Sequence, residues 1–192
     1  MSELRTGKPA LGLFLTGALW LTSPAAFGAG YELMRQPVYI GAKACAECHS
    51  GEAMGHQFSK WRISAHARAY AALGRPEAKA IAERAGIPGE PQEAKYCLGC
   101  HATAAESEDW EQLEDFHLQD GLQCEACHGP GSEYAYRDIM KNREQAMALG
   151  LKIPDKDTCL ICHRRKGSHA AVLGERPFDL EQAWQEIAHP LA

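Results

Sequence analysis

The clearest pattern of apolar and polar positions lies near the end of the chain. Four apolar residues there follow the i, i+3, i+4, i+7 spacing of one helix face: Leu180, Ala183, Trp184 and Ile187. Asp179 is a suitable N-cap, and Gln182 stands three residues later, as in a capping box. The pattern predicts a helix that begins after Asp179, carries His189 at its end and is stopped by Pro190.

Three further helices are predicted upstream. Residues 52–73 contain no proline and end before Gly74, which stops a helix well. Residues 76–85 open on a proline and close at Gly86, the usual asymmetry of helix ends. Residues 132–150 form the third helical segment, which also ends on a glycine.

The segments between these helices carry turn signals. Residues 87–95 contain two prolines and are predicted to be a loop, and residues 129–131 read Gly-Pro-Gly, a tight turn. Residues 102–116 are acidic and suit either a helix or an exposed loop. No segment shows the alternation of a half-buried strand, so the expected fold class is mostly α with little regular β structure.

The N-terminus is typical of a signal peptide. Two basic residues precede the apolar stretch 10–22, which is too short to span a bilayer well. Small residues suit cleavage near Gly28, so the expected domains are a signal peptide, residues 1–28, and a mature domain, residues 29–192. The protein is then periplasmic or otherwise exported. An uncleaved N-terminal anchor is the alternative, and the one expected route to a membrane.

The charge balance excludes some classes of partner. The chain of 192 residues has 20 basic and 25 acidic residues. Cleavage after Gly28 removes Glu3, Arg5 and Lys8, which leaves 18 basic and 24 acidic residues, a net charge of −6. Nucleic acid needs a basic face, and an anionic membrane surface needs clustered basic residues, so neither is expected to bind.

All eight cysteines belong to one repeated motif. The chain holds four copies of C-x-x-C-H: Cys45, Cys48 and His49; Cys97, Cys100 and His101; Cys124, Cys127 and His128; Cys159, Cys162 and His163. The first cysteines are 52, 27 and 35 residues apart, which is too uneven for a solenoid.

C-x-x-C-H is the attachment motif of c-type haem. Two thiols one helical turn apart add to the two vinyl groups of one porphyrin, and the adjacent histidine becomes the proximal iron ligand. Structural zinc and disulfides leave the four identically placed histidines unexplained, and four thioredoxin-like pairs are implausible in so short a chain. We therefore expect four covalent, thioether-linked haem c groups, one per motif. About 41 residues per haem then implies a haem-filled core and an apoprotein that folds poorly.

Five histidines remain for the distal side of four irons. They are His56, His66, His117, His169 and His189. We expect mostly bis-histidine ligation, with His66 and His189 favoured because each lies on or ends a predicted helix. His56 is only seven residues past His49, too close to cap the same iron easily. Four methionines are weaker candidates: Met34, Met54, Met140 and Met147.

The sequence resembles the tetrahaem cytochrome c-554-like family. Four stretches carry the resemblance: residues 39–45, 61–67, 121–131 and 178–190. The resemblance implies a mostly helical fold, haems in close stacked and perpendicular pairs, electron shuttling, and distal ligands at His66 and His189. It also implies one five-coordinate haem.

The chain departs from the family after the Gly-Pro-Gly turn. The name-giving member carries a distal histidine there, where this chain has Tyr134 and Tyr136. His56, His117 or His169 could replace that ligand. The nitrifier partner of the name-giving member is therefore not carried over.

The function expected from these features is electron transfer between redox partner proteins. One alternative is a haem enzyme that oxidises or reduces a small nitrogen compound, such as nitric oxide, nitrite or hydroxylamine, at an open iron. Another is a subunit of a polymeric cytochrome wire, in which a histidine such as His56 ligates a neighbour's iron. The sequence leaves the oligomeric state open.

Overall fold

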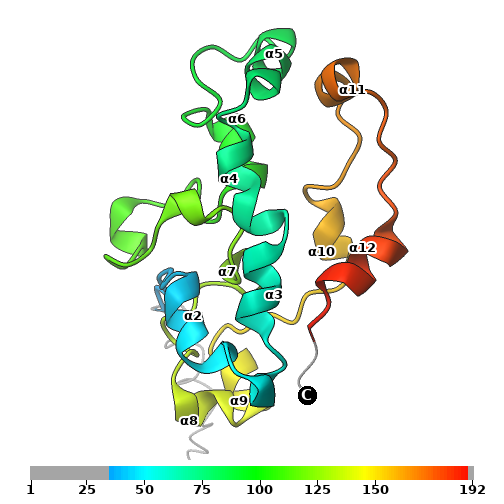
Figure 1. Cartoon of the computed structure of the whole chain (residues 1–192). Coiled ribbons are helices and arrows are strands. Elements are labelled where there is room, and N and C mark those ends of the chain that lie inside the picture. The colour runs from blue at the N-terminus through cyan, green and yellow to red at the C-terminus, as the bar shows by residue number, and fades with distance from the viewer. Residues whose placement is uncertain (1–34, 190–192) are drawn as a thin grey trace, which may run out of the picture. The chain divides into compact units, whose positions relative to one another are not determined.

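The structure is a computed structural model that describes residues 35–189, and the described residues from Gln36 onward belong to one unit (Figure 1). The predicted signal peptide and Pro190 lie outside the described residues. Within residues 35–189 no helix is long and apolar enough to cross a membrane. Helices dominate this part of the chain, and its β structure is one isolated bridge between Tyr39 and Gln112, so the predicted fold class is confirmed.

The helices are short. The α-helices are α2 (Ala42–His49), α3 (Gln57–Ile63), α4 (Ala69–Ala72), α5 (Pro76–Arg84), α6 (Lys95–His101), α7 (Glu125–His128), α8 (Arg137–Met140), α9 (Arg143–Ala148), α10 (Lys156–Leu160), α11 (Gly167–Leu173) and α12 (Leu180–Ile187). The 3₁₀ helices are η1 (Glu52–Met54), η2 (His66–Arg68), η3 (Asp109–Glu111) and η4 (Leu118–Asp120). Figure 1 shows α5, α6 and α11 at one end of this unit and α2, α8 and α9 at the other.

The prediction of a single helix over residues 52–73 is wrong. The chain forms η1, α3, η2 and α4 there, because three residues leave the helical conformation. Gly55 and His56 are left-handed, with φ of 78° and 55°, and Ser64 is extended. These breaks turn the chain between α3 and η2, where His66 lies.

The predicted helix over residues 132–150 is also shorter than expected. It divides into α8 and α9, because Tyr136 and Asn142 are extended residues that begin each helix anew. The Asn142 side chain caps α9 by accepting from the Gln145 backbone N–H. Residues 102–116 form mainly an exposed loop that contains η3, which was the alternative to a helix.

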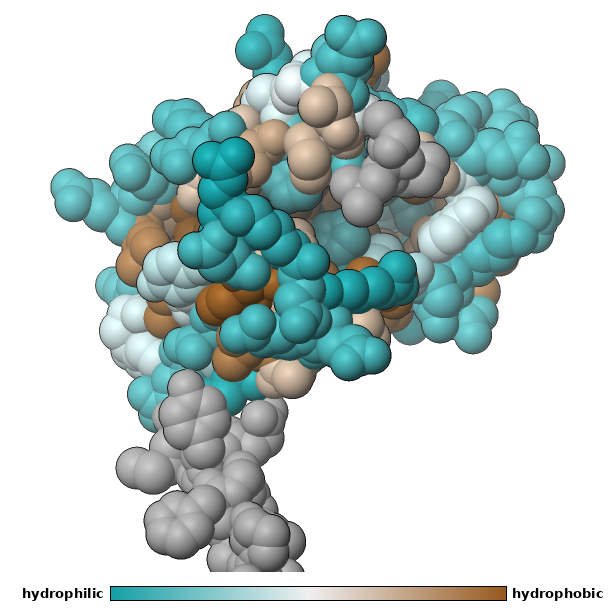
Figure 2. Space-filling view, turned by 90° about the horizontal axis from the view of Figure 1, so that it is seen from below, coloured by the Kyte–Doolittle hydropathy of each residue, from teal (hydrophilic) through white to brown (hydrophobic). Residues whose placement is uncertain are grey.

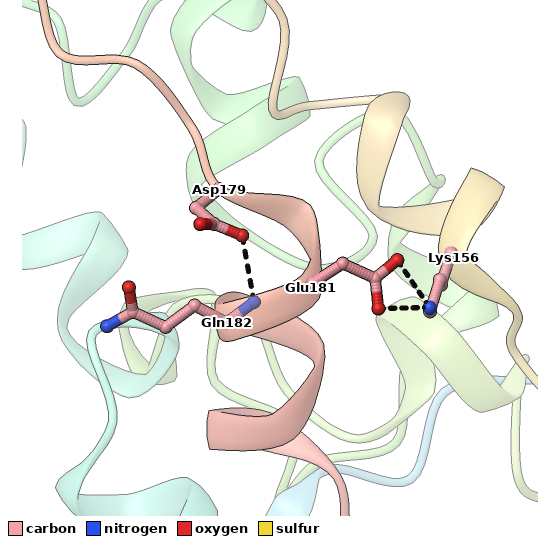
Figure 3. A network of polar contacts seen from close by, with 4 residues as sticks. All are labelled: Lys156, Asp179, Glu181 and Gln182. Atoms are coloured by element: carbon pink, nitrogen blue, oxygen red, sulfur yellow. Dashed lines mark hydrogen bonds and ion pairs between the residues drawn. The ribbon is translucent and has the colours of Figure 1, made fainter.

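Two predicted helices are confirmed. α5 starts with proline at its first turn, and the chain leaves it through Gly86 at φ 68°. α12 begins after Asp179, whose side chain accepts from the Gln182 backbone N–H at 3.0 Å (Figure 3). The capping box is only half formed, because the Gln182 side chain donates to Glu186 instead.

A buried carboxylate joins the start of the unit to the third motif. Glu125 is 3% exposed, and its Oε1 accepts from the backbone N–H groups of Ile40 at 2.9 Å and Gly131 at 2.7 Å. Its Oε2 accepts from Gly41 at 2.9 Å. Burial raises the pKa of Glu125, and the three backbone N–H groups oppose that rise.

Glu125→Ala should destabilise the holoprotein by about 3 kcal/mol, a fall in Tm of about 10 °C. The reason is that three N–H donors, from Ile40, Gly41 and Gly131, lose their acceptor in a buried place. Thermal unfolding with intact haem loading is the measurement. Glu144→Ala, which removes an exposed acid in α9, is the matched control. Equal melting of the two variants would contradict this role for Glu125.

The chain supplies little apolar core of its own. Leu73, Leu98 and Ala102 form a small cluster, and among the described residues no large side chain is less than 2% exposed. On the face drawn in Figure 2, hydrophilic residues predominate and apolar residues reach the surface between them. A unit of this size therefore needs something else in its interior.

Candidate functional site

The four C-x-x-C-H motifs each form about one helical turn. The first and second motifs end α2 and α6, the third spans α7, and the fourth continues from α10. The His128 N–H donates to the Cys124 carbonyl, and the His163 N–H to the Cys159 carbonyl, both at 2.9 Å. All eight cysteines lie in the described residues, and none of them forms a disulfide.

The motifs surround one large cavity. Its volume is about 2490 Å³, whereas pockets for single small ligands hold about 300–1,000 Å³. Seven of the eight cysteines line it: Cys45, Cys97, Cys100, Cys124, Cys127, Cys159 and Cys162. Seven of the nine histidines line it as well: His49, His66, His101, His128, His163, His169 and His189. His56 and His117 are exposed and do not line the cavity.

The cavity wall suits large apolar plates. Tyr96 directly precedes Cys97, and Ile161 lies between the two cysteines of the fourth motif. Both side chains line the cavity, and they are 85% and 66% exposed. Side chains of this kind are expected to be covered in a folded protein. Within residues 35–189 no three His, Cys, Asp or Glu side chains converge as ligands for a bare metal ion. The residues present therefore fit a macrocycle attached to the cysteines better than zinc.

Two pairs of histidine rings face each other across the cavity. The ring centres of His66 and His163 are 5.9 Å apart, and those of His128 and His189 are 6.0 Å apart. Two imidazoles that share one metal lie about 6 Å apart, given metal–nitrogen bonds of about 2 Å on each side. Each pair joins a motif histidine to one predicted as a distal ligand, so each is spaced to hold one iron.

A third pair is more loosely placed. His169 lies on α11 within electrostatic reach of His101, and both line the cavity. α11 packs against α5, near α6 and its motif (Figure 1).

Fixed acceptors orient four of the cavity histidines through Nδ1. His49 Nδ1 lies 2.8 Å from Gln57 Oε1, and the other three acceptors are backbone carbonyls. The Nδ1 of His101 lies 2.9 Å from the Ala69 carbonyl oxygen, and that of His128 lies 2.9 Å from the Lys152 carbonyl oxygen. The Nδ1 of His189 lies 2.8 Å from the Ile187 carbonyl oxygen. A carbonyl oxygen can only accept, so Nδ1 carries the proton and Nε2 is left for a metal.

Four of the histidines that line the cavity are favoured in the neutral form. Burial lowers the pKa of His66, His128, His163 and His169. The neighbouring ring of His163 lowers the pKa of His66 further. A neutral imidazole has the free lone pair that a metal requires.

The motifs do not meet in their order along the chain. Cys45 of the first motif hydrogen-bonds to Cys124 of the third, and this contact and burial raise the pKa of the Cys45 thiol. Cys127 of the third motif lies close enough to Cys159 of the fourth for a charge on one thiol to affect the other. Burial and a hydrogen bond to Cys100 of the second motif raise the pKa of the Cys162 thiol to about 11. The spatial order is therefore first, third, fourth, second.

The backbone at Gly121 holds His66 in place. The His66 carbonyl accepts from the Leu122 N–H at 3.0 Å, and the Trp61 ring N–H donates to the Leu122 carbonyl at 2.6 Å. Gly121 has φ of 73° and ψ of −139°, a conformation reserved for glycine. A Cβ at this position would stand 2.5 Å from the His66 carbonyl oxygen.

Gly121→Ala should destabilise the protein by about 3 kcal/mol, because the new methyl group adds a backbone clash to an unfavourable φ and ψ. It should also displace His66 and give a partial high-spin signal from one haem. Gly86→Ala is the matched control, since its φ is 68° and a Cβ there meets nothing within 4 Å. That variant should lose only about 1 kcal/mol. Equal effects in thermal unfolding and absorption spectra would contradict this role for Gly121.

α12 positions His189 beside His128. Lys156 of α10 forms an ion pair with Glu181 of α12 at 2.5 Å, which ties the fourth motif to this helix (Figure 3). At the other end, the Lys60 ammonium donates to the carbonyl of Ala188, the residue before His189. The partly exposed Lys156–Glu181 pair contributes about 1 kcal/mol or less, so its role is chiefly orientation.

Three site residues were missed by the sequence analysis. Gln57 orients His49, Glu125 anchors the third motif, and the Phe178 ring stacks on His163 with centres 4.1 Å apart. Neither Gln57 nor Glu125 stands at a recognisable spacing from its partner. Glu125 and Phe178 both lie in stretches that carried the family resemblance, residues 121–131 and 178–190, and that was the only available signal.

Comparison with known proteins agrees with this geometry. The family model of cytochrome c554 and c-prime matches residues 44–129, which contain the first three motifs. No curated protein and no solved structure is significantly similar to the chain. The match supports a c554-like cytochrome family, and with it covalently bound c-type haem and haem-based electron transfer.

Proposed function

We propose that this chain, a c554-like cytochrome over residues 44–129, is an exported carrier that passes electrons through four covalent haems. The observation that carries the proposal is the shared cavity, which is lined by cysteines of all four motifs and by histidines facing motif histidines. Haem supplies a one-electron iron couple. The protein supplies ligands, burial and charge, which set the potential of each haem.

The histidine ring spacings support bis-histidine ligation of two irons, and the place of His169 suggests a third. His66 would complete the iron of His163, and His189 that of His128, because their ring spacings suit a shared metal. His169 would complete the iron of His101, because both line the cavity and α11 packs against α5, next to α6 in Figure 1. Bis-histidine ligation keeps potentials low in comparison with methionine ligation.

The cysteine contacts support a route for electrons. Haems attached at neighbouring cysteines lie close together, so electrons would move between the first, third, fourth and second haems in that order. The two ends of this route are α2 and α6, at opposite ends of the unit in Figure 1. Electrons can then enter at one end and leave at the other.

The charge supports transient partners. A mature chain of net charge −6 would meet basic faces of redox proteins through long-range attraction. Glu106 and Glu111 border the haem cavity and contribute to that attraction. Export to the periplasm fits both the N-terminal segment and haem attachment outside the cytoplasm.

The intact mass of the denatured mature protein should exceed that of its chain by four haem masses, and a redox titration should take up four electrons reversibly. Four motifs that use every cysteine are the reason for this expectation. A film voltammogram should show no catalytic current with nitrite or hydroxylamine. Fewer haems in matured protein would contradict the stoichiometry, and turnover of either compound would favour the enzyme.

A further inference from the structure

A second, smaller cavity lies against α2, between this helix and the acidic loop of residues 102–116. Its volume is about 420 Å³, which is within the range of pockets that hold small ligands. We call it the α2 groove, and its lining combines three apolar residues with three acids: Ile40, Ala44, Leu113, Glu47, Glu114 and Asp115. Among the described residues none lines both this groove and the haem cavity, so haem in the larger cavity would leave the groove open.

Backbone contacts hold the two sides of the α2 groove together. The Tyr39 N–H donates to the Glu111 carbonyl at 2.7 Å, and the Leu113 N–H donates to the Tyr39 carbonyl at 2.9 Å. Gly41, at φ 86°, allows the loop to approach closely, because a Cβ there would stand 3.2 Å from the Asp115 carbonyl oxygen. The groove is therefore built into the fold, and within it the Leu113 side chain stays 50% exposed.

The α2 groove adjoins the first haem-attachment motif. Ala44 directly precedes Cys45, and Glu47 lies between the two cysteines of the motif. Cys48 is exposed, and of the eight cysteines, all of which are described, it is the one that does not line the haem cavity. The first haem would therefore be attached close to the surface, beside the groove. The first motif is also one end of the electron route proposed above, so the groove lies where electrons enter or leave.

The charge around the α2 groove is acidic. Among the described residues Lys43 is the single basic residue that lines it, against three acids. The loop that supplies Leu113 adds four more acids between residues 106 and 111, and residues 102–120 contain no lysine or arginine. The other end of the route differs, because the basic run 164–166 follows the fourth motif and Lys166 Nζ lies 3.8 Å from Cys100 Sγ of the second. The two ends therefore suit partners of opposite charge.

We propose that the α2 groove is the docking site of a redox protein with a basic face, and that a lysine or arginine side chain of that partner occupies the groove. The apolar stem of this side chain would lie on Leu113 and Ala44, and its charged head would meet Glu114 and Asp115. One electron then passes between the first haem and the partner's own redox centre, and no proton moves. This inference rests on the proposed function, because it presupposes a haem at the first motif.

Stopped-flow oxidation of the fully reduced holoprotein by a basic monohaem cytochrome c with histidine–methionine ligation tests the site. One electron passes from the holoprotein to each ferric probe molecule, because methionine ligation gives the probe the higher potential. The second-order rate constant should fall as the ionic strength rises, since salt screens the attraction. The same probe with its lysines acetylated should react about tenfold more slowly at low salt.

Glu114→Gln with Asp115→Asn should lower this rate constant about tenfold at low salt and by much less at high salt. Both residues lie outside the haem motifs, so the four haems should be retained. Glu83→Gln with Glu93→Gln is the matched control, because it removes two exposed acids from α5 and from the loop before α6. The control should react as the wild-type protein does.

Leu113→Ala tests the apolar part of the α2 groove. It should lower the rate constant about threefold at low and at high salt, because an apolar contact is not screened. Met147→Ala is the control, since this side chain is 48% exposed and lines neither cavity. Carbodiimide cross-linking to the basic probe gives a second readout, and the cross-links should map to Glu47, Glu114 or Asp115.

Three results would overturn the inference. They are equal rate constants in the Glu114–Asp115 variant and its control, a native probe that reacts no faster than the acetylated one, and cross-links that map mainly to α5 or α6. A holoprotein that does not take up four electrons reversibly in a redox titration would instead contradict the proposed function.

Discussion

His66→Ala should convert one low-spin haem, the one attached at Cys159 and Cys162, entirely to the high-spin state. The His66 and His163 ring centres are 5.9 Å apart, the spacing of two imidazoles on one metal. Without His66 the fourth iron loses its sixth ligand, and the loss of a strong donor raises its potential. His189→Ala should do the same to the third haem, because His189 faces His128 at 6.0 Å.

Electron paramagnetic resonance and a potentiometric titration of the holoprotein measure both effects. Each variant should bind one more equivalent of cyanide than the wild-type protein, and the double variant should bind two more. His56→Ala is the control, since it removes an exposed histidine outside the cavity. Spectra that remain fully wild type in both single variants, with no replacement ligand found, would show that the pairing is wrong.

The chain without haem should not fold. Among the described residues only nine apolar residues are buried, four of them are alanine, and no large side chain is fully buried. The cavity of about 2490 Å³ stands where a core would be, so collapse without haem would destroy the arrangement of the helices. Isolated helices of this length are unstable in water, and the longest α-helix described is α5, with nine residues.

A variant of the mature chain in which serine replaces every motif cysteine tests whether the chain folds without haem. It should show little helical circular dichroism, no cooperative melting transition and rapid proteolysis, whereas the holoprotein should melt cooperatively. The effect is the whole free energy of unfolding rather than a fraction of it. A cooperative transition in the haem-free chain at a similar temperature would show that the peptide has a sufficient core of its own.

Local chemistry is what could be predicted from the sequence. The four C-x-x-C-H motifs are contiguous, and attachment of haem needs only two thiols and a histidine within one helical turn. α5 and α12 were likewise predictable, because a proline, an N-cap and an apolar face lie within each segment. These features depend on residues that are neighbours along the chain.

The prediction of longer helices was wrong for a physical reason. Residues 52–73 have good helix propensity, yet the chain breaks at His56 and Ser64 so that His66 can face His163. Propensity is worth tenths of a kcal/mol per residue, roughly, and tertiary contacts override it. A contact between residues far apart along the chain, His66 and His163, therefore decided the local structure here.

The facing of particular histidine rings and the spatial order of the motifs were decided only by the tertiary structure. The sequence offered five distal histidines, while the fold brings three of them into the cavity opposite particular motifs and leaves His56 and His117 outside. It also places the first motif beside the third and the fourth beside the second, although these are far apart along the chain. Short motifs specify which groups bind haem, because that chemistry is local. Which histidine meets which iron depends on the packing of segments separated by dozens of residues, and no spacing in the sequence encodes it.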